Sequence, residues 1–381
     1  MSALPAAGAT ARVARLWISE FRCFESADVR FADGLTVLTG ANGQGKTSLL
    51  EAVGWVARSR SFRGVPDAAL VRTGAEIAVV RAEILTGERT QLFEAEVRAN
   101  GRNRVLINRN PAGRARDRYG LLRVTVFSPD DLELVKGGPS ERRAYLDDLL
   151  SMLAARYDAA RGDLERVLRQ RNALLRSGVR DDEARTTLDV FDEQLVRSGS
   201  ELVRGRLRLV ERLGPAVADA YRELADAPVP VEVAYDAEWA AGALDIDAVD
   251  DIPERLRAAL AARRRDEIDR GMTLVGPQRD ELRLLLGDLD ARTHASQGEQ
   301  RTLALALRLA GHDLCSELTH STPVLLLDDV FSELDARRAA ALVHRLPAGQ
   351  TLLTTAGAIP DGVQPQRTLR VVAGRVEPEE S

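Results

Sequence analysis

The sequence predicts an α/β protein with a phosphate-binding loop, a mixed sheet that includes an antiparallel β subdomain, and an inserted helical hairpin arm. Three observations predict this class. A short apolar run near residue 35 leads into a glycine-rich loop and then into a helix. Several runs of strand period follow, up to about residue 127. From Pro139 the apolar residues recur at helical spacing, and after residue 271 strands and helices alternate again. Such alternation is typical of a sheet covered by helices.

The glycine-rich loop matches the pattern G-x-x-x-x-G-K-[ST] at every fixed position. Its glycines let the backbone turn so that several N–H groups point at one anion, and the following helix adds the positive end of its dipole. We expect Lys46 to reach the β- and γ-phosphates of a nucleotide such as ATP and the Thr47 hydroxyl to hold Mg²⁺. A loop that merely turns a strand into a helix would not need this Lys-Thr pair. The predicted binding residues are Gly40, Ala41, Asn42, Gly43, Gln44, Gly45, Lys46, Thr47 and Ser48.

Composition limits the function classes. The 53 basic and 58 acidic residues give a net charge of -5, which argues against a uniformly basic nucleic-acid binder but not against a local basic patch. Only two of the basic residues are lysines, Lys46 and Lys136. The two cysteines, Cys23 and Cys315, form neither a disulfide framework nor a metal-binding spacing, so we expect a cytoplasmic protein. No apolar run approaches the roughly 18 residues that span a membrane.

The expected elements fall into three parts. Residues 1–138 form the first half of an ATPase head, with strands at 13–18, 35–39, 77–86, 91–98, 105–107 and 121–127 and a helix at 46–57. Residues 139–271 form a helical arm of two helices of roughly 35 residues each, or about 50 Å at 1.5 Å per residue, followed by a strand at 229–235 and a helix at 253–270. Residues 272–381 return to the head, with strands at 281–286, 323–327 and 350–355 and helices at 296–314 and 335–346.

Two acidic residues end a continuous apolar run at residues 324–327. Such a run is typical of a strand buried on both faces, and ligands bind at the carboxyl ends of such strands. We expect Asp328 to hold Mg²⁺ and Asp329 to orient or deprotonate an attacking water. With Lys46, these are the predicted catalytic residues, whereas Thr47 and Asp328 are the predicted metal-binding pair. A strand that simply ends in solvated acids is the alternative.

A second polar segment opens the helix that begins near residue 296. Ser296 and Glu299 have the spacing of a capping box, which is the ordinary interpretation. The other interpretation is a second anion site at a helix N-terminus. A further segment, S-x-L-D, follows the paired acids at residues 332–335. The candidate residues of the anion site are Ser296, Gln297, Gly298, Glu299 and Gln300.

The four motifs occur in the order phosphate loop, S-x-G-x-Q, apolar strand with Asp-Asp, and S-x-L-D. In this order they resemble the ABC-type ATPase heads of the SMC group and, most closely, the RecF family of bacterial recombination-repair proteins. Residues 127–132, 136–143 and 275–280, which read FSPDDL, KGGPSERR and VGPQRD, carry the same resemblance. It covers about residues 15 to 355 and implies an ABC-type P-loop ATPase head.

The resemblance implies that Lys46 and Thr47 bind one ATP in their own chain, whereas Ser296 and Gly298 meet the γ-phosphate of an ATP held by a second subunit. Two ATP molecules would then hold a homodimer together until hydrolysis. Asp329 stands where ABC ATPases usually have Glu, so we expect slow ATP hydrolysis that acts as a timer. The resemblance also implies that this weak ATPase activity depends on DNA. Gln278 stands where many members of the family have His. The implied ligands are double-stranded DNA and single-/double-strand junctions, the implied partners are RecR and RecO, and the implied role is recombinase loading at single-stranded gaps.

A basic stretch is the candidate DNA surface. Seven arginines and one acid lie between Arg98 and Arg118, and we add Arg58, Arg60 and Arg63 to this surface. Arginine-rich, solvated hairpin edges are the alternative interpretation. Three other function classes stay open: an SMC-type DNA tether, for which the arm is short; the ATPase subunit of a membrane transporter; and a small-molecule kinase, which would need neither the Ser296 segment nor the S-x-L-D segment.

Overall fold

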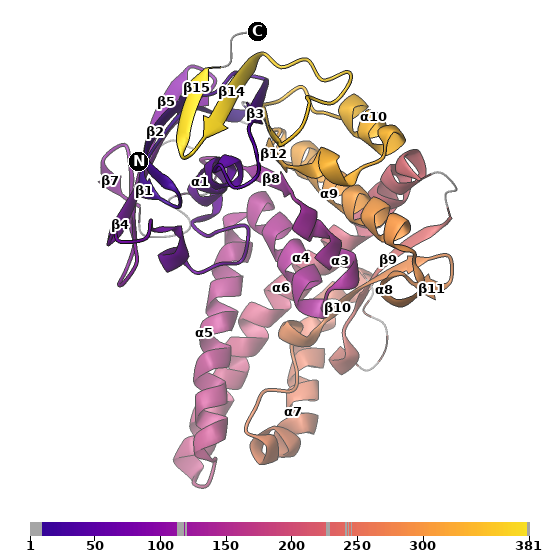
Figure 1. Ribbon diagram of the computed structural model, residues 1–381. Helices are drawn as coiled ribbons and strands as arrows, with labels where there is room; N and C mark the ends of the chain where they lie inside the picture. The colour runs from indigo at the N-terminus through magenta and orange to yellow at the C-terminus, as the bar shows by residue number, and fades with distance from the viewer. Residues whose placement is uncertain are drawn as a thin grey trace. The chain divides into compact units, whose positions relative to one another are not determined.

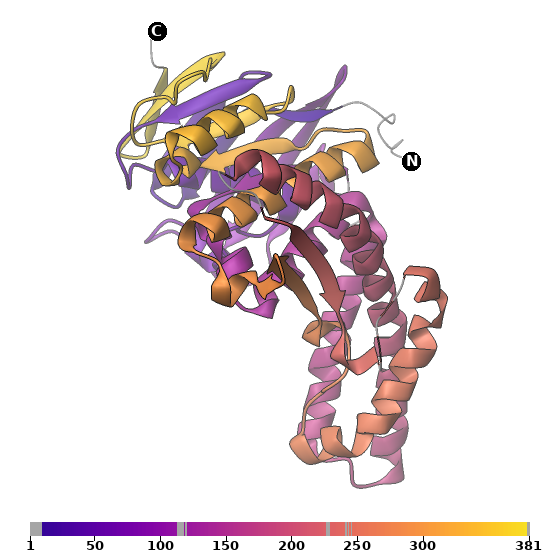
Figure 2. The ribbon, with the colours of Figure 1, turned by 90° about the vertical axis from the view of Figure 1, so that its right-hand side faces the viewer.

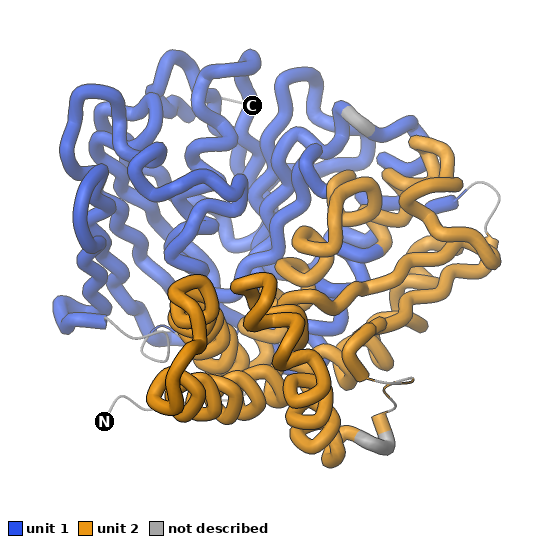
Figure 3. The backbone as a smooth tube through the Cα atoms, turned by 90° about the horizontal axis from the view of Figure 1, so that it is seen from below, with its two compact units in different colours: residues 1–131, 223–226, 307–381 blue, residues 132–222, 227–306 orange. Residues whose placement is uncertain are grey.

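The computed structural model describes residues 10–112, 118, 120–225, 229–240, 242, 244 and 246–378. Contacts divide the chain into two compact units, coloured in Figure 3. Unit 1 comprises residues 1–131, 223–226 and 307–381, and unit 2 comprises residues 132–222 and 227–306. Residues 272–306, which we assigned to the second half of the head, group with unit 2, because β10 (Glu281–Leu286) pairs with β9 (Val231–Asp236) of that unit.

The central sheet of unit 1 has the strand order β15-β14-β3-β13-β12-β8. Its five strands from β14 to β8 are parallel, and β15 pairs antiparallel with β14 at the edge. All five residues of β12 are buried, as the continuous apolar run predicted. The two strands nearest the carboxyl end of the chain, β14 and β15, were not predicted. The bounds are β3 Leu35–Thr39, β8 Val124–Phe127, β12 Val324–Asp328, β13 Thr351–Thr355, β14 Arg367–Val372 and β15 Arg375–Pro378.

The second sheet of unit 1 is antiparallel, with the order β2-β1-β4-β5-β6-β7. Its strands alternate buried and exposed positions, which is the period-2 pattern that predicted most of them. The pair β4 and β5 joins at Gly87, whose φ of 59° is one that glycine adopts readily. The bounds are β1 Ala11–Phe21, β2 Phe24–Arg30, β4 Ile77–Thr86, β5 Arg89–Arg98, β6 Arg104–Ile107 and β7 Asn110–Pro111.

Helix α1 (Lys46–Arg58) lies between the two sheets, where it packs against β8, β12 and β13 on one side and β1 and β4 on the other (Figure 1). A helix in this position is apolar on nearly all sides, and residues 49–56 of α1 are all buried. Trp55 packs edge-on against Phe93, with 6.3 Å between ring centres. The start of α1, which the phosphate loop requires, is therefore fixed by the main core of unit 1.

The sheets are also joined by one buried amide. The side chain of Gln350 accepts a hydrogen bond from the Val13 N–H at 2.8 Å and donates to the carbonyls of Val13 and Ala32, both at 2.8 Å. The remaining helices of unit 1 include α10 (Ala336–His344) and the second half of α9 (Gln297–Thr319). Short 3₁₀ segments are η1 Asp67–Leu70, η2 Pro129–Leu132 and η6 Val330–Glu333.

Unit 2 contains long helices that run side by side (Figures 1 and 2) and a three-stranded sheet. The first predicted arm helix is in fact two, α4 (Pro139–Leu153) and α5 (Ala155–Ser177), because Ala154 is extended with φ -155° and ψ 137°. The second, α6, is longer than predicted at 43 residues. The other elements are α3 Glu133–Lys136, α6 Asp182–Leu224, α7 Ile252–Arg270, α8 Ala291–His294, β11 Leu289–Asp290, η3 Glu238–Ala240, η4 Ile246–Asp251 and η5 Pro277–Arg279.

None of the helices in the described part of the chain combines the length and apolarity of a membrane span.

A buried arginine connects three helices of unit 2. Arg171 of α5 donates to Asp192 of α6 at 2.7 Å, to Glu267 of α7 at 2.5 Å and to the Thr273 hydroxyl at 2.9 Å. Arg171 is fully buried and Glu267 is 1% exposed. Removing one member of such a network leaves the others charged in a place that water does not reach.

We therefore expect Arg171→Ala to lower the free energy of unfolding by about 3–5 kcal/mol. Arg166→Ala on the same helix is the matched control. It removes only an exposed pair with Asp163, so its effect should stay within about 1 kcal/mol. Urea unfolding followed by circular dichroism measures both. Equal effects would show that the buried network contributes no more than the surface pair.

A second buried ionisable group lies in unit 1. His312 of α9 is 3% exposed, and neither ring nitrogen has a hydrogen-bond partner in the described part of the chain. Burial lowers the pKa of His312 from 6.5 to about 4. The unfolded chain therefore binds more protons than the folded one between pH 4 and 6.5, and the folded state loses stability as the pH falls through this range.

At pH 5 this loss should be about 2 kcal/mol relative to pH 7. His312→Leu removes the titrating ring. Between pH 7 and pH 5, the free energy of unfolding of this variant should therefore fall by about 2 kcal/mol less than that of the unmodified protein. Urea unfolding of both proteins at the two pH values measures the difference. Parallel pH profiles would mean that the ring becomes protonated without unfolding the unit.

Candidate nucleotide-binding site

The phosphate loop connects β3 to α1 and adopts backbone angles that require glycine. Gly40 has φ 143°, and a Cβ there would lie 2.3 Å from the Val371 carbonyl oxygen of β14. Gly45 has φ 113°, and a Cβ there would lie 2.7 Å from the Cys23 sulfur. Both glycines are therefore needed for the turn and for close packing against neighbouring strands. The sequence pattern predicted the turn but not these contacts.

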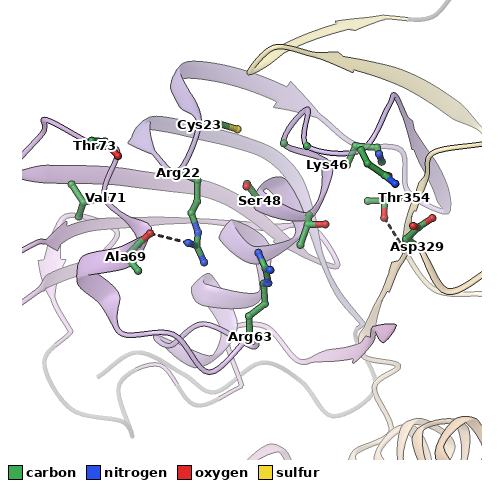
Figure 4. Close-up of a pocket in the computed structure, with 14 residues that line it drawn as sticks. Arg22, Cys23, Lys46, Ser48, Arg63, Ala69, Val71, Thr73, Asp329 and Thr354 are labelled. Carbon is green, nitrogen blue, oxygen red and sulfur yellow. Dashed lines mark hydrogen bonds between the residues drawn. The ribbon is translucent and has the colours of Figure 1, made fainter. Parts of the chain in front are cut away.

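Lys46 is almost fully buried at 6% exposure, and its ammonium donates to the carbonyls of Gly40 at 2.5 Å and Ala41 at 3.0 Å. Burial lowers its pKa, whereas the carboxylates of Asp329 and Asp328 act in the opposite direction. The ammonium is thus held against the loop itself, on the side where Asp329 lies (Figure 4). This position is the one from which a lysine can reach the phosphates of a nucleotide bound in the loop.

A chain of hydrogen bonds joins α1 to the ends of β12 and β13. The Thr47 hydroxyl donates to Oδ1 of Asp328 at 2.8 Å, and the Thr354 hydroxyl donates to the same oxygen at 2.9 Å. The backbone N–H of Asp329 donates to the Thr354 hydroxyl at 2.9 Å. Burial raises the pKa of Asp328, while the bonds from Thr47 and Thr354 and the charge of Arg63 lower it. The structure therefore brings together the two residues that the sequence predicted as a metal-binding pair.

These residues fit Mg²⁺. A hydroxyl and a carboxylate oxygen lie 2.8 Å apart at the mouth of a phosphate loop, and oxygen is the ligand that Mg²⁺ prefers. Within the described ranges no group of three His, Cys, Asp or Glu side chains could form an all-protein metal site. Mg²⁺ usually needs none, because it is bound by one or two protein groups together with nucleotide phosphates and water.

Asp329 has an unusual backbone conformation. Its φ of 51° and ψ of 27° place a non-glycine residue in the left-handed region, directly after the buried strand β12. The carbonyl of Asp329 accepts a hydrogen bond from the Ser332 hydroxyl at 2.7 Å, and Asp335 caps α10 by accepting from the Arg338 N–H at 2.9 Å. The side chain of Asp329 lines the pocket (Figure 4). The role expected for its carboxylate, to orient or deprotonate a water, stays a prediction.

The pocket around these residues has a volume of about 660 Å³. Two arginines line it (Figure 4). Arg22 forms a bidentate pair with the fully buried Glu51 at 2.7 and 2.8 Å and donates to the Ala69 carbonyl at 2.9 Å. Arg63, which we assigned to the candidate DNA surface, also lines this pocket, and its role in DNA binding stays a prediction. Cys23 and Thr354 line it as well, together with Ala69, Val71 and Thr73, which the sequence did not single out.

The loop after β8 also lies at the carboxyl edge of the central sheet, because β8 is parallel to β12. Asp131 in this loop is 8% exposed, accepts from the Ser128 N–H at 2.9 Å and pairs with Arg308 of α9 at 2.7 Å. This stretch carried part of the resemblance, but the sequence did not predict its partner, which lies far along the chain.

The segment from Ser296 to Gln300 lies in unit 2 and forms the capping box that the ordinary interpretation predicted. The Ser296 N–H and hydroxyl both donate to Glu299, at 2.8 and 2.7 Å. This bond lowers the pKa of Glu299. Ser296 and Gln297 are exposed and Gly298 is half-buried. Gln300 is buried, and its amide donates to the carbonyls of Ala291 and Arg292, so this side chain supports the loop from beneath.

The candidate DNA surface is only partly described, since residues 113–117 lie outside the described ranges. Arg98 pairs with Glu96 at 2.7 Å, and Arg104 lies 3.8 Å from the same carboxylate. Arg102 and Arg109 are exposed. Arg58 donates to the Val124 carbonyl at 3.0 Å. The surface is therefore less positive than its arginine count suggests, and its role in DNA binding stays a prediction.

The fold and site place the chain in a known class. The model of the RecF/RecN/SMC N-terminal domain matches residues 12–355. The chain is thus an ATPase head of the RecF/RecN/SMC type. The DNA replication and repair protein RecF of Streptomyces avermitilis is 44% identical over 374 residues, which cover 96% of this chain and 99% of that protein. The chain belongs to the RecF family.

Solved structures agree with this assignment. The recombination mediator protein RecF with ATP, in the RecFOR pathway, is 28% identical, has a TM-score of 0.90 and aligns over 98% of this chain and 99% of its own. The head of an SMC protein bound to the C-winged helix domain of ScpA is 16% identical with a TM-score of 0.56, over 96% of both chains, and shows the fold alone. The predicted ABC-type ATPase head is confirmed.

Two threonines of β13 provide a matched test of the site. The Thr354 hydroxyl connects Asp328 to Asp329, whereas the Thr351 hydroxyl is buried without a hydrogen-bond partner in the described ranges. We expect Thr354→Val to slow ATP hydrolysis about tenfold. The variant loses one hydrogen bond to a charged group, which contributes about 1.5–3 kcal/mol. If about half of this energy is lost only in the transition state, the rate falls about tenfold. Thr351→Val should leave hydrolysis unchanged. Single-turnover hydrolysis measures both, and equal rates would show that Thr354 does not position the acids.

Proposed function

We propose that the chain is an ATP-dependent DNA-binding protein of recombinational repair, in which ATP joins two copies into a dimer. The observation that carries the proposal is the division of the nucleotide motifs. The phosphate loop, Thr47, Asp328 and Asp329 form one site in unit 1, whereas the exposed Ser296 segment belongs to unit 2. A kinase acting alone would not need the second segment. In the dimer, Ser296 and Gly298 of one copy face the γ-phosphate of the ATP held by the other.

The chain's own residues have distinct parts in this cycle. Backbone N–H groups of residues 40–48 and the Lys46 ammonium bind the phosphates. Thr47 and Asp328 hold Mg²⁺, which, when bound, neutralises charge on the β- and γ-phosphates. Asp329 accepts a proton from the attacking water at its carboxylate, or orients that water. The Asp side chain is one methylene shorter than Glu, so we expect weak hydrolysis that dissolves the dimer slowly. By its membership of the RecF family, we also propose that DNA stimulates this hydrolysis.

The ligands and partners follow from the relatives. A structure of a RecF protein with ATP is described as that of a recombination mediator in the RecFOR pathway. We propose RecR and RecO as partners of this chain, and double-stranded DNA and single-/double-strand junctions as its ligands. The dimer would promote recombinase loading at single-stranded gaps. The exposed Arg102 and Arg109 are candidates for phosphate contacts. We also propose a cytoplasmic location.

Two variants test the division of roles. Lys46→Ala should abolish nucleotide binding. Ser296→Arg should leave ATP binding by the monomer within about twofold but prevent the ATP-dependent dimer, because a bulky side chain then occupies the place of the trans phosphate. Analytical sedimentation with and without ATP, Mg²⁺ and duplex DNA measures the oligomeric state, and a fluorescent ATP analogue measures binding. If the unmodified protein binds ATP tightly but stays monomeric, a phosphotransferase acting as a single subunit becomes the better proposal.

A further inference from the structure

Lys136 is an unusual basic residue in this chain. Only two of the 53 basic residues are lysines, and the other one, Lys46, lies in the phosphate loop. Lys136 is exposed, and within the described ranges no side chain pairs with its ammonium. Lysine differs from arginine in carrying a compact point charge on a flexible stem. In a chain that uses arginine at nearly every basic position, an exposed lysine without a protein partner in the described ranges is a candidate for a ligand contact.

The backbone that carries Lys136 is firmly held. Lys136 ends α3, and the next N–H, that of Gly137, donates to the Glu133 carbonyl at 2.9 Å. A Cβ at Gly137 would lie 2.4 Å from that carbonyl oxygen, so the turn requires glycine. From the other side, the buried Arg142 donates to the carbonyls of Leu134, Val135 and Gly137 at 3.2, 3.3 and 3.0 Å.

Arg142 is in turn held by Glu281 of β10 through two bonds, at 2.7 and 2.9 Å. In the motif KGGPSERR, the buried Arg142 therefore stabilises the backbone around Lys136, whereas the Lys136 side chain itself is exposed. A rigid backbone beneath an unpaired charge is what a preorganised ligand contact needs, because little freedom is lost when the ligand binds.

The same support carries the Ser296 segment. Helix α3 packs against α8, and α8 is followed two residues later by Ser296. Gln300 fastens the start of α9 to α8 through the carbonyls of Ala291 and Arg292, at 3.3 and 3.1 Å. Lys136 and Ser296 therefore lie on neighbouring segments of one unit.

The chemistry of the Ser296 segment needs an additional cation. Ser296 is bonded to Glu299, which the lowered pKa keeps charged, so an approaching phosphate meets a carboxylate. The helix N-terminus supplies only about half a positive charge against it. A full positive charge on the adjacent α3 offsets the carboxylate and leaves the site attractive to an anion.

We propose that the Lys136 ammonium binds the terminal phosphate of a nucleotide held by a second copy of this chain, beside Ser296. This inference rests on the proposed ATP-dependent dimer. A charge-assisted hydrogen bond of this kind corresponds to about a tenfold change in affinity. Each dimer contains the contact twice, so the dimer dissociation constant should change by about a hundredfold.

The test uses the full-length protein. In saturating ATP and Mg²⁺, Lys136→Ala should raise the dimer dissociation constant about a hundredfold in sedimentation, and Lys136→Arg should restore part of the loss. Binding of a fluorescent ATP analogue to the monomer should not change. Arg169→Ala, an exposed substitution on α5, is the control and should dimerise normally. A normal dimer for Lys136→Ala, or a loss of DNA binding with the dimer intact, would overturn the proposal. Failure of the unmodified protein to dimerise would instead overturn the proposed function itself.

Mixed dimers show in which copy Lys136 acts. Chains labelled at the amino terminus with donor or acceptor dyes report only mixed pairs. The first pair combines a Lys46→Ala chain with a Lys136→Ala chain. Only the Lys136→Ala chain binds ATP, and this ATP faces the Lys136 of the other chain. In the second pair, the double variant meets the unmodified chain, so the only working loop faces a chain that lacks it. The first pair should form at about tenfold lower concentration. The reverse order would assign Lys136 to its own nucleotide, and equal pairing would remove it from the site; either result overturns the proposal.

Discussion

The site depends on one oxygen atom. Oδ1 of Asp328 accepts hydrogen bonds from Thr47, at the start of α1, and from Thr354, at the end of β13. Three elements that are distant in the sequence are thereby held in register, and the Thr354 hydroxyl extends the link to the backbone of Asp329. Because the carboxylate is buried, each donor has a larger effect than it would in water, and the loss of either leaves a charged oxygen with too few partners. The proposed metal-binding pair and the acid proposed to orient water are thus positioned by the same bonds.

The position of α1 makes this arrangement rigid. The helix lies between two sheets, and its one buried acid, Glu51, is paired with Arg22 and hydrogen-bonded to Ser61. Arg22 also binds the Ala69 carbonyl, so the antiparallel sheet, the helix and the segment lining the pocket form one connected core. An isolated phosphate loop would be free to move, whereas here the first turn of α1 cannot shift without breaking a buried ion pair. The antiparallel subdomain therefore contributes to the candidate nucleotide site.

Local pattern and long-range contact account for what the sequence could and could not predict. Residues 40–48 and Asp328-Asp329 were predicted because strand, loop and acid are adjacent in the chain and each has its own signature. Arg22 and Arg308 were missed because their partners, Glu51 and Asp131, lie 29 and 177 residues away in the chain, and no local period reveals such pairing. The hydrogen bond from Thr354 to Asp328 was missed for the same reason. The break at Ala154 was missed because the apolar period continues through it, with Tyr157 still buried. The place of Arg63 beside the phosphate loop was not predicted, because charge alone does not show which exposed arginine lines a pocket.

In the proposed dimer, each nucleotide lies between the phosphate-loop site of unit 1 in one copy and the Ser296 segment and Lys136 of unit 2 in the other. The charged groups of these two parts differ in whether they already have hydrogen-bond partners in their own chain. This difference supports a ligand shared between copies. In unit 1, Lys46 is bonded to loop carbonyls and Asp328 to two hydroxyls, so the half that holds the nucleotide is nearly complete by itself. In unit 2, Ser296 is bonded to a charged Glu299, and Lys136 has no partner in the described ranges. No ion pair joins Lys136 to Glu299 in the described ranges, although α3 packs against α8, which directly precedes the Ser296 segment. A nucleotide bound to unit 1 of one copy has its phosphate charge already partly neutralised there. In the proposed dimer, the Lys136 ammonium and the Ser296 hydroxyl of the other copy would together bind its terminal phosphate. Loss of that phosphate would remove the contact between the copies.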